Sequence, residues 1–127
     1  MATDHAPHAI EDKECEWEYA RPGMLGLQTA LSIVVRTTGL DWDTIAERMS
    51  RTPARIAGLT GHGHDPAPGA PATFTLVDPA AVWRVEPGEL ASKSRNTPYA
   101  AMELPVRVVA TFLRGRGTVL DGKVVGG

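Results

Sequence analysis

The sequence predicts an α/β portion followed by a β portion, and three observations support this division. Apolar residues recur at helical spacing between residues 24 and 58. A stretch rich in glycine, histidine and proline follows at residues 61–71. Beyond it, short runs of β-branched and aromatic residues alternate with turn residues. We therefore expect an N-terminal part over residues 1–60, a linker over 61–71 and a β portion over 72–127.

The first expected elements are a loop and an amphipathic helix. Residues 9–22 are polar and acidic and lead into a Pro-Gly pair, which is typical of a long surface loop. Apolar side chains then recur with helical periodicity from Met24 to about Arg36, and Gly39 follows as a stop signal. This pattern predicts a helix over residues 24–36.

Two further helices are expected before the linker. Asp41 or Asp43 can cap the first of them, because a short acidic side chain accepts a hydrogen bond from the free N–H groups of a first helical turn. Thr52 as N-cap and Pro53 at the first helical position then predict a separate short helix that ends near Gly58.

The second half is expected to form a small, mostly antiparallel sheet. Turn residues separate its strands at Asp78-Pro79, at residues 115–117 and at Asp121-Gly122, and the last pair is a strong signal for a two-residue hairpin. The expected strands lie at residues 73–77, 82–85, 106–113, around 119 and at 124–125.

Composition excludes several functions. With 127 residues the chain is too short for a complete (β/α)8 barrel, which takes roughly 250 residues. The net charge of -2 gives no basic excess that would attract nucleic acid. No apolar run approaches the roughly 20 residues that span a bilayer, and the first residues lack the basic region followed by an apolar stretch that is typical of a secretion signal. We expect a cytoplasmic protein with no nucleic-acid or membrane partner, in which the single Cys15 is a free thiol.

The start of the chain carries the strongest chemical signal, a carboxylate and two imidazoles within five residues (Asp4, His5 and His8). This signal lies in the run Ala-Thr-Asp-His-Ala-Pro-His at residues 2–8, and Arg-Pro-Gly-Met-Leu-Gly follows at 21–26. Together these runs resemble the last barrel strand and following loop of dihydroorotases, which are zinc enzymes of the amidohydrolase superfamily.

The second half extends the resemblance to residue 125. Ser-Arg-Asn-Thr-Pro-Tyr at 94–99 and Asp-Gly-Lys-Val at 121–124 are similar to segments of the β-sandwich that superfamily members carry beside the barrel. Leu104-Pro105 departs from the Leu-x-Gly of many relatives, and we expect this departure to affect a turn rather than the chemistry. The resemblance implies the last strand and helices of an amidohydrolase (β/α)8 barrel followed by part of the composite β-sandwich domain.

The resemblance also implies a set of site residues. Asp4 would ligate one zinc ion and act as the catalytic general base. His8 would contact the substrate carboxylate, and Pro22 and Gly23 would help to enclose the substrate ring. Pro22 departs from the aromatic residue of many relatives, whereas Gly23 matches them. If this segment is a strand, the His5 side chain would project to the side opposite Asp4, and we expect it to pack or to make a supporting hydrogen bond.

The implied reaction is the reversible conversion of dihydroorotate and N-carbamoyl-L-aspartate in de novo pyrimidine biosynthesis, at a binuclear zinc site. The remaining metal ligands would come from earlier barrel strands, because a catalytic zinc usually takes three protein ligands and a water. We therefore expect a C-terminal fragment that is inactive alone, that needs the missing N-terminal barrel segment as its partner, and that is marginally stable or aggregates.

Two other readings stay open. The nearest enzymatic alternative is a hydantoinase- or allantoinase-like amidohydrolase, which acts on a related cyclic amide. The alternative from another class is a non-catalytic dihydroorotase-like scaffold of aspartate transcarbamoylase, which the loss of metal ligands favours and the retention of Asp4 and His8 opposes.

A second histidine pair is expected to have no role in catalysis. His62 and His64 form a His-x-His pair, which is also the first metal-binding motif of the superfamily. That motif normally follows an apolar strand, whereas this pair lies in the Gly/Pro linker, so we interpret both as solvent-exposed loop histidines. We likewise expect Trp17, Trp42 and Trp83 to be packing residues, because no basic residues are interleaved with them.

Overall fold

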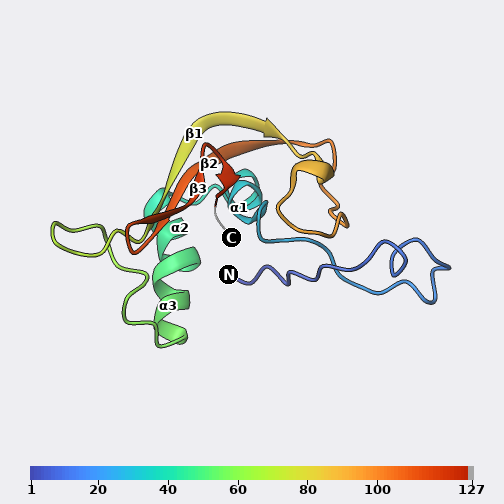
Figure 1. The fold of residues 1–127 in the computed structure, drawn as a ribbon, viewed down its shortest axis with the longest axis horizontal. Helices are drawn as coiled ribbons and strands as arrows, with labels where there is room; N and C mark the ends of the chain where they lie inside the picture. Colours follow the sequence, from blue (N-terminus) through green and yellow to red (C-terminus); the bar gives the residue numbers. More distant parts are fainter. Residues whose placement is uncertain (126–127) are drawn as a thin grey trace.

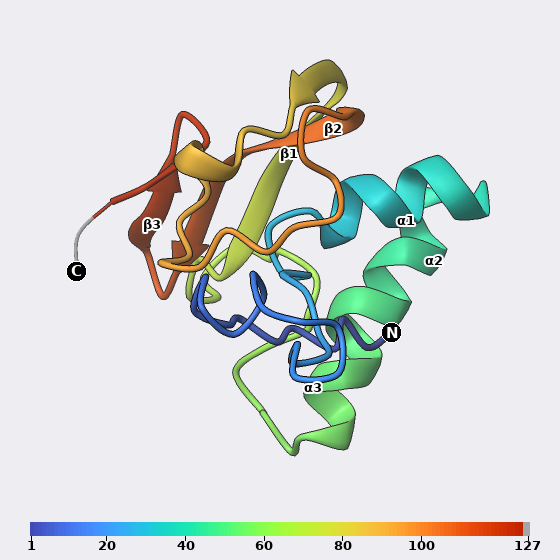
Figure 2. The ribbon, with the colours of Figure 1, turned by 90° about the vertical axis from the view of Figure 1, so that its right-hand side faces the viewer.

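The computed structural model describes residues 1–125. A four-stranded antiparallel sheet forms one layer, helix α1 packs against it, and a second helical segment lies beside them (Figure 1). The N-terminal segment passes these elements and leads into a loop that projects away from the sheet, toward the viewer in Figure 2. Among the described residues, no helix is long and apolar enough to cross a membrane.

The sheet confirms the expected antiparallel arrangement, with its strands ordered as they occur in the chain. Two expected strands are in fact one, because pairing resumes beyond the Asp78-Pro79 turn signal after an irregularity. The Asp78 carboxylate accepts from the N–H groups of Ala80 (2.9 Å) and Ala81 (3.2 Å), which satisfies donors that the irregularity removes from the ladder. The strands are β1 (Phe74–Arg84), β2 (Glu103–Leu113), β3 (Arg116–Leu120) and β4 (Lys123–Val124).

Both hairpins that follow β2 use two residues with positive φ. Asp121 (φ 50°) and Gly122 (φ 74°) join β3 to β4, as predicted. Arg114 (φ 50°) and Gly115 (φ 84°) join β2 to β3, so this turn begins one residue earlier than the predicted 115–117. Two left-handed residues match the twist of the flanking strands, which explains the preference for glycine there.

Helix α1 (Ala30–Thr38) is shorter than predicted and begins six residues after Met24. The reason is that Met24 is extended and forms a parallel bridge with His5, and its carbonyl accepts from Ala6 N at 2.9 Å. Tertiary pairing therefore overrides the helical periodicity at the start of this segment. The predicted end is confirmed, because Gly39 adopts the left-handed conformation with φ 63°.

The second helical segment is continuous from Trp42 to Ile56. The Asp41 side chain accepts from Thr44 N at 2.9 Å, so Asp41 is the cap of this segment. It consists of α2 (Trp42–Ala46), the π-helical turn η1 (Glu47–Arg51) and α3 (Thr52–Ile56).

The predicted break at Thr52 is wrong. The Thr52 N–H donates to the Glu47 carbonyl five residues earlier, and its hydroxyl donates to the Glu47 carboxylate at 2.5 Å, so Thr52 does not cap a new helix. Pro53 consequently lies inside a continuous helical segment. A wide π-helical turn is one of the few local structures that can precede such a proline without ending the helix.

The core is small and lies where the sheet, α1 and the connection between β1 and β2 meet. That connection includes the short 3₁₀ helix η2 (Pro87–Glu89). Trp83 packs against the core as predicted, whereas Trp17 is 92% exposed on the projecting loop and the packing prediction for it is wrong. The four buried residues of the core are Leu25, Val85, Leu90 and Leu104.

The departure at Leu104-Pro105 lies inside β2 and not in a turn. The next residue, Val106, adopts a positive φ of 62°, which is rare for a β-branched side chain. Its carbonyl accepts from the Ser32 hydroxyl of α1 at 2.9 Å and lies 3.1 Å from Trp83 Nε1. The unusual backbone at this point therefore ties α1 to the sheet.

Residues 2–8, expected to form a barrel strand, form no regular strand and are not part of the described sheet; Asp4 has a positive φ of 48°, and the segment pairs only through the bridge from His5 to Met24. A strand needs neighbours for its backbone groups, and the four described strands belong to the other half of the chain. The expected linker at 61–71 lies in the irregular stretch between α3 and β1.

Candidate functional site

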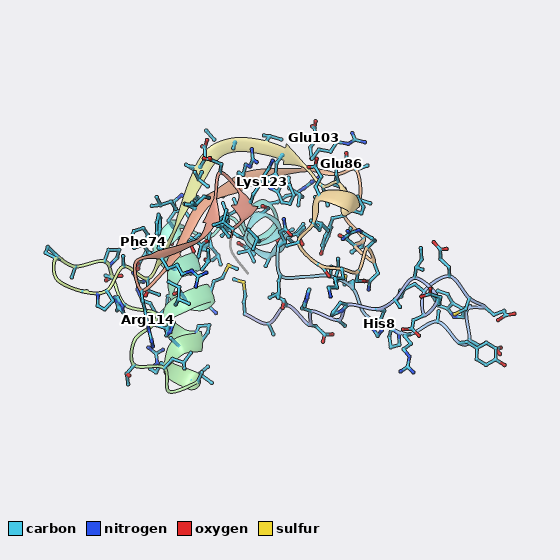
Figure 3. The ribbon with its side chains drawn as sticks, in the orientation of Figure 1. His8, Phe74, Glu86, Glu103, Arg114 and Lys123 are labelled. Carbon is cyan, nitrogen blue, oxygen red and sulfur yellow. The ribbon has the colours of Figure 1, made fainter. Side chains whose placement is uncertain are left out.

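The candidate site lies at the base of the projecting loop, where residues 5–8 and 22–26 run side by side. The bridge between His5 and Met24 joins the two segments, and Figure 3 shows His8 where the N-terminal segment enters the loop. This arrangement brings the two motifs of the dihydroorotase resemblance together, although about a dozen residues separate them in the sequence.

Three of the four predicted site residues meet here. His8 is partly buried, and its Nε2 lies 2.9 Å from the Pro22 carbonyl, to which it donates. A Cβ atom built on Gly23 would lie 3.2 Å from the same nitrogen. His8, Pro22 and Gly23 thus form one contact, and their substrate-binding role stays a prediction.

Gly23 cannot be replaced without strain at this position. Its φ of 120° is a conformation that L side chains rarely adopt. A Cβ atom here would also lie 2.6 Å from the Ala6 Cβ, well inside van der Waals contact. The close approach of the two segments therefore depends on glycine.

The fourth predicted residue, Asp4, lies apart from this contact. Its side chain is exposed and its backbone has a φ of 48°, which aspartate tolerates better than most residues. Among the described residues, no hydrogen bond joins the Asp4 carboxylate to His8, Pro22 or Gly23. The carboxylate is accessible, and its catalytic role stays a prediction.

His5 makes the supporting hydrogen bonds that were one of its two expected roles. Its Nδ1 accepts from Gly26 N at 3.1 Å and from Leu27 N at 3.4 Å. Since Nδ1 accepts both bonds, the imidazole fixes the chain just before α1. Gly26 itself is close to the N-terminal segment, because a Cβ atom there would lie 2.7 Å from the Thr3 carbonyl.

Lys13 is a positioning residue that sequence reasoning missed. Its Nζ donates to the Arg21 carbonyl at 2.6 Å and to the Gly23 carbonyl at 3.2 Å. The His8 side chain donates to the Pro22 carbonyl, so each backbone carbonyl from residue 21 to 23 accepts a hydrogen bond from a side chain. The sequence shows Lys13 only as a base among acidic residues, and no local pattern connects it with these carbonyls.

Asn96 and Ser94 reach the same place from the second half of the chain. The Asn96 side-chain amide donates to the Ala6 carbonyl at 3.1 Å and to the Gly23 carbonyl at 3.2 Å. The Ser94 hydroxyl accepts from His8 N at 3.2 Å. The sequence analysis assigned residues 94–99 to the sandwich and missed their contacts with residues 6, 8 and 23. The only signal in the sequence was that this polar segment is similar to one in the family.

The described residues alone do not complete a zinc site. Asp4 offers one ligand, and within residues 1–125 there is no group of three or more histidine, cysteine, aspartate or glutamate side chains that could hold a metal ion. A catalytic zinc usually takes three protein ligands and a water. His62 is partly buried, and His64 is exposed with its Nδ1 3.1 Å from the Asp65 carbonyl. A zinc ion at Asp4 would need ligands outside these residues.

Comparisons with known proteins identify relatives over almost the whole chain. It is 56% identical over 128 residues to a dihydroorotase of Streptomyces coelicolor, a match that covers 98% of this chain and 30% of that protein. It is 53% identical over 128 residues to a dihydroorotase of Mycobacterium tuberculosis, with the same coverage. No family profile matches the chain.

Solved structures of cyclic-amide hydrolases share the fold. The L-hydantoinase (dihydropyrimidinase) of Arthrobacter aurescens superposes with a TM-score of 0.84 at 27% identity, over 97% of this chain and 29% of that protein. A D-hydantoinase (dihydropyrimidinase) of Thermus sp. superposes with a TM-score of 0.83 at 19% identity, over 98% of this chain and 29% of that protein, which supports the fold alone.

The resemblance derived from the sequence is therefore confirmed. This chain spans about 30% of the length of the dihydroorotases that it matches. Its solved structural neighbours are hydantoinases of the amidohydrolase superfamily. By sequence and fold, the chain is a dihydroorotase-like segment of that superfamily.

Proposed function

We propose that this chain forms part of a dihydroorotase-type hydrolase that interconverts dihydroorotate and N-carbamoyl-L-aspartate in de novo pyrimidine biosynthesis. The observation that carries the proposal is the contact of His8 with Pro22 and Gly23. This contact joins the two motif segments, residues 2–8 and 21–26, at one place. The identity of 56% to a protein named dihydroorotase supports it. The rest of the enzyme would supply the barrel segment and the other metal ligands.

In this proposal Asp4 carries the proton transfer. Its exposed carboxylate would take a proton from the attacking water and deliver it to the amide nitrogen of the ring as the C–N bond breaks. Asp4 would also be one ligand of zinc, and zinc chemistry lowers the pKa of a bound water to about 7. A carboxylate is suited to both tasks because it has two acceptor oxygens.

His8, Pro22 and Gly23 would hold the substrate and take no part in the proton transfer. The Pro22 carbonyl fixes the orientation of the His8 ring through Nε2 before any substrate binds. Gly23 carries no side chain, so a ring can approach its backbone closely. A fixed imidazole beside a backbone segment without side chains suits a small cyclic anion such as dihydroorotate.

A hydantoinase-like activity is the second candidate, because the structural neighbours bear that name. Their identity of 27% or less is about half that to the dihydroorotases, which favours dihydroorotate. The two candidates differ in the cyclic amide that is opened, so a substrate comparison separates them.

The test is a chimera in which this chain replaces the matching segment of the Streptomyces relative. Hydrolysis of dihydroorotate, hydantoin and allantoin is measured with purified protein whose fold is checked by circular dichroism. We expect activity on dihydroorotate. A folded chimera that opens hydantoin or allantoin but not dihydroorotate contradicts the proposal, and so does one that opens none of them.

Asp4→Asn in the chimera tests the proton-transfer role. We expect kcat to fall by at least about 100-fold, which is the lower range for general acid-base catalysis. Asp121→Asn is the matched control, because both residues are exposed and have φ values near 50° (48° and 50°), where asparagine is well tolerated. A similar kcat in both variants would remove Asp4 from the catalytic role.

A further inference from the structure

Asn96 bridges the two segments that carry the proposed substrate contacts. Its side-chain nitrogen donates to Ala6 on the first segment (3.1 Å) and to Gly23 on the second (3.2 Å). The amide oxygen faces the other way and accepts from His8 N at 3.4 Å. An asparagine offers two donors and an acceptor in one plane, and this residue uses both kinds.

The bridge is supported by the neighbouring chain. The Asn96 carbonyl accepts from Leu25 N at 3.1 Å, and Leu25 is 5% exposed in the core. The hydroxyl of Ser94 accepts from His8 N at 3.2 Å and also contacts the Asn96 side-chain oxygen. Asn96 is therefore anchored to the core on one side and reaches the substrate-contact segments on the other.

Asn96 differs from the other residues that hold these segments. Lys13 belongs to the projecting loop itself, whereas Asn96 comes from the connection between β1 and β2, more than 70 residues away from Gly23 (sequence separation 73). Together with Ser94, it links the second half of the chain to His8 and Gly23.

We infer that Asn96 is a positioning residue for substrate binding, which acts through His8 and Gly23 and does not itself react. The inference rests on the proposed function, because it concerns the same substrate contacts. Since these contacts bind and do not transfer protons, loss of the bridge raises KM and leaves kcat nearly unchanged.

The test is Asn96→Asp in the chimera described above. Aspartate has the same shape, but its carboxylate cannot donate to the Ala6 and Gly23 carbonyls. We expect KM for dihydroorotate to rise at least about tenfold and kcat to change by less than about twofold. Asn96→Ser, which is neutral and too short to reach both carbonyls, is the second variant if the first does not fold.

Gln28→Ala is the matched control. The Gln28 side chain also links distant parts of the chain, because its oxygen accepts from Ala91 N at 2.9 Å. It leaves His8 and Gly23 untouched. The inference is overturned if Asn96→Asp raises KM no more than Gln28→Ala does, or if it lowers kcat as strongly as it raises KM.

A second measurement separates failure of the inference from failure of the proposed function. In the chimera, trypsin cleavage after Lys13 reports how often the projecting loop opens, because the Lys13 Nζ is bound to two carbonyls of the closed loop. Cleavage at least about tenfold faster in Asn96→Asp than in Gln28→Ala supports the bridge even if the chimera acts on another substrate. Equal cleavage rates overturn it even if the chimera opens dihydroorotate.

Discussion

Gly23→Ala is the most direct test of how the candidate site is held together. The substitution introduces two faults at once. The backbone φ of 120° becomes strained for an L residue, at a cost of about 1–3 kcal/mol. The new Cβ also meets the Ala6 Cβ at 2.6 Å, so the two segments must separate.

Separation adds the loss of a hydrogen bond to this cost. The bond from Ala6 N to the Met24 carbonyl, 2.9 Å long, joins the segments at this point, and such a bond contributes about 1 kcal/mol net. A total of at least about 2 kcal/mol shifts the opening equilibrium of the loop by about 30-fold or more. We expect trypsin to cleave after Lys13 faster by that factor, because cleavage follows the open population when opening is rapid.

Gly39→Ala is the matched control for strain alone. Gly39 also has a positive φ, 63°, but no atom lies within 4 Å of the position of its Cβ. We expect it to lower the global free energy of unfolding without changing the relative rate of cleavage after Lys13. The reasoning is refuted if Gly23→Ala leaves this cleavage rate unchanged, or if Gly39→Ala raises it equally.

Two further predictions concern stability, measured by urea unfolding of the chimera. Ser32→Ala is expected to lower the unfolding free energy by about 1–2 kcal/mol, because its hydroxyl donates to the Val106 carbonyl at 2.9 Å in a buried position. Asp41→Ala is expected to destabilise the chain at neutral pH by removing the cap of α2. The hydrogen bonds from Thr44 hold the pKa of Asp41 below its usual 3.8, so the stabilisation is present above that value and is lost as the pH falls through the lowered pKa. An unfolding free energy of Asp41→Ala that differs equally from the parent at pH 7 and pH 2 would contradict this.

Local signals in the sequence located the elements whose ends depend on local chemistry. The stop at Gly39 and the hairpin at Asp121-Gly122 were predicted, and Asp41 was one of the two predicted candidates for the cap, because each rests on backbone geometry within a few residues. Tertiary pairing decided the rest. The helical periodicity beginning at Met24 gives way to the bridge with His5, which a local pattern cannot show.

The candidate site divides in the same way. The family-like motifs selected His8, Pro22 and Gly23, and the structure places these residues in contact. Lys13 and Asn96, which hold that contact, were missed because they act through backbone carbonyls. Every residue has a backbone carbonyl, so the identity of the acceptor residue does not predict the hydrogen bond. Only the folded structure shows which side chain donates to it.

Val106 and Ser32 show how a side-chain hydrogen bond to a backbone carbonyl can offset an unfavourable backbone conformation. A left-handed conformation costs an L residue about 1–2 kcal/mol, and Val106 adopts it with φ 62°. The turned backbone directs the Val106 carbonyl at the Ser32 hydroxyl and the Trp83 ring nitrogen.

If this hydroxyl helps to hold the strained backbone, the two residues are coupled, and Ser32→Ala will cost less in a Val106→Gly background than in the parent chain. A double-mutant cycle measures that coupling as the difference between the two costs. Equal losses of unfolding free energy in both backgrounds would mean that the hydrogen bond from Ser32 does not help to hold the conformation of Val106. The strand pairing of β2 would then hold it alone.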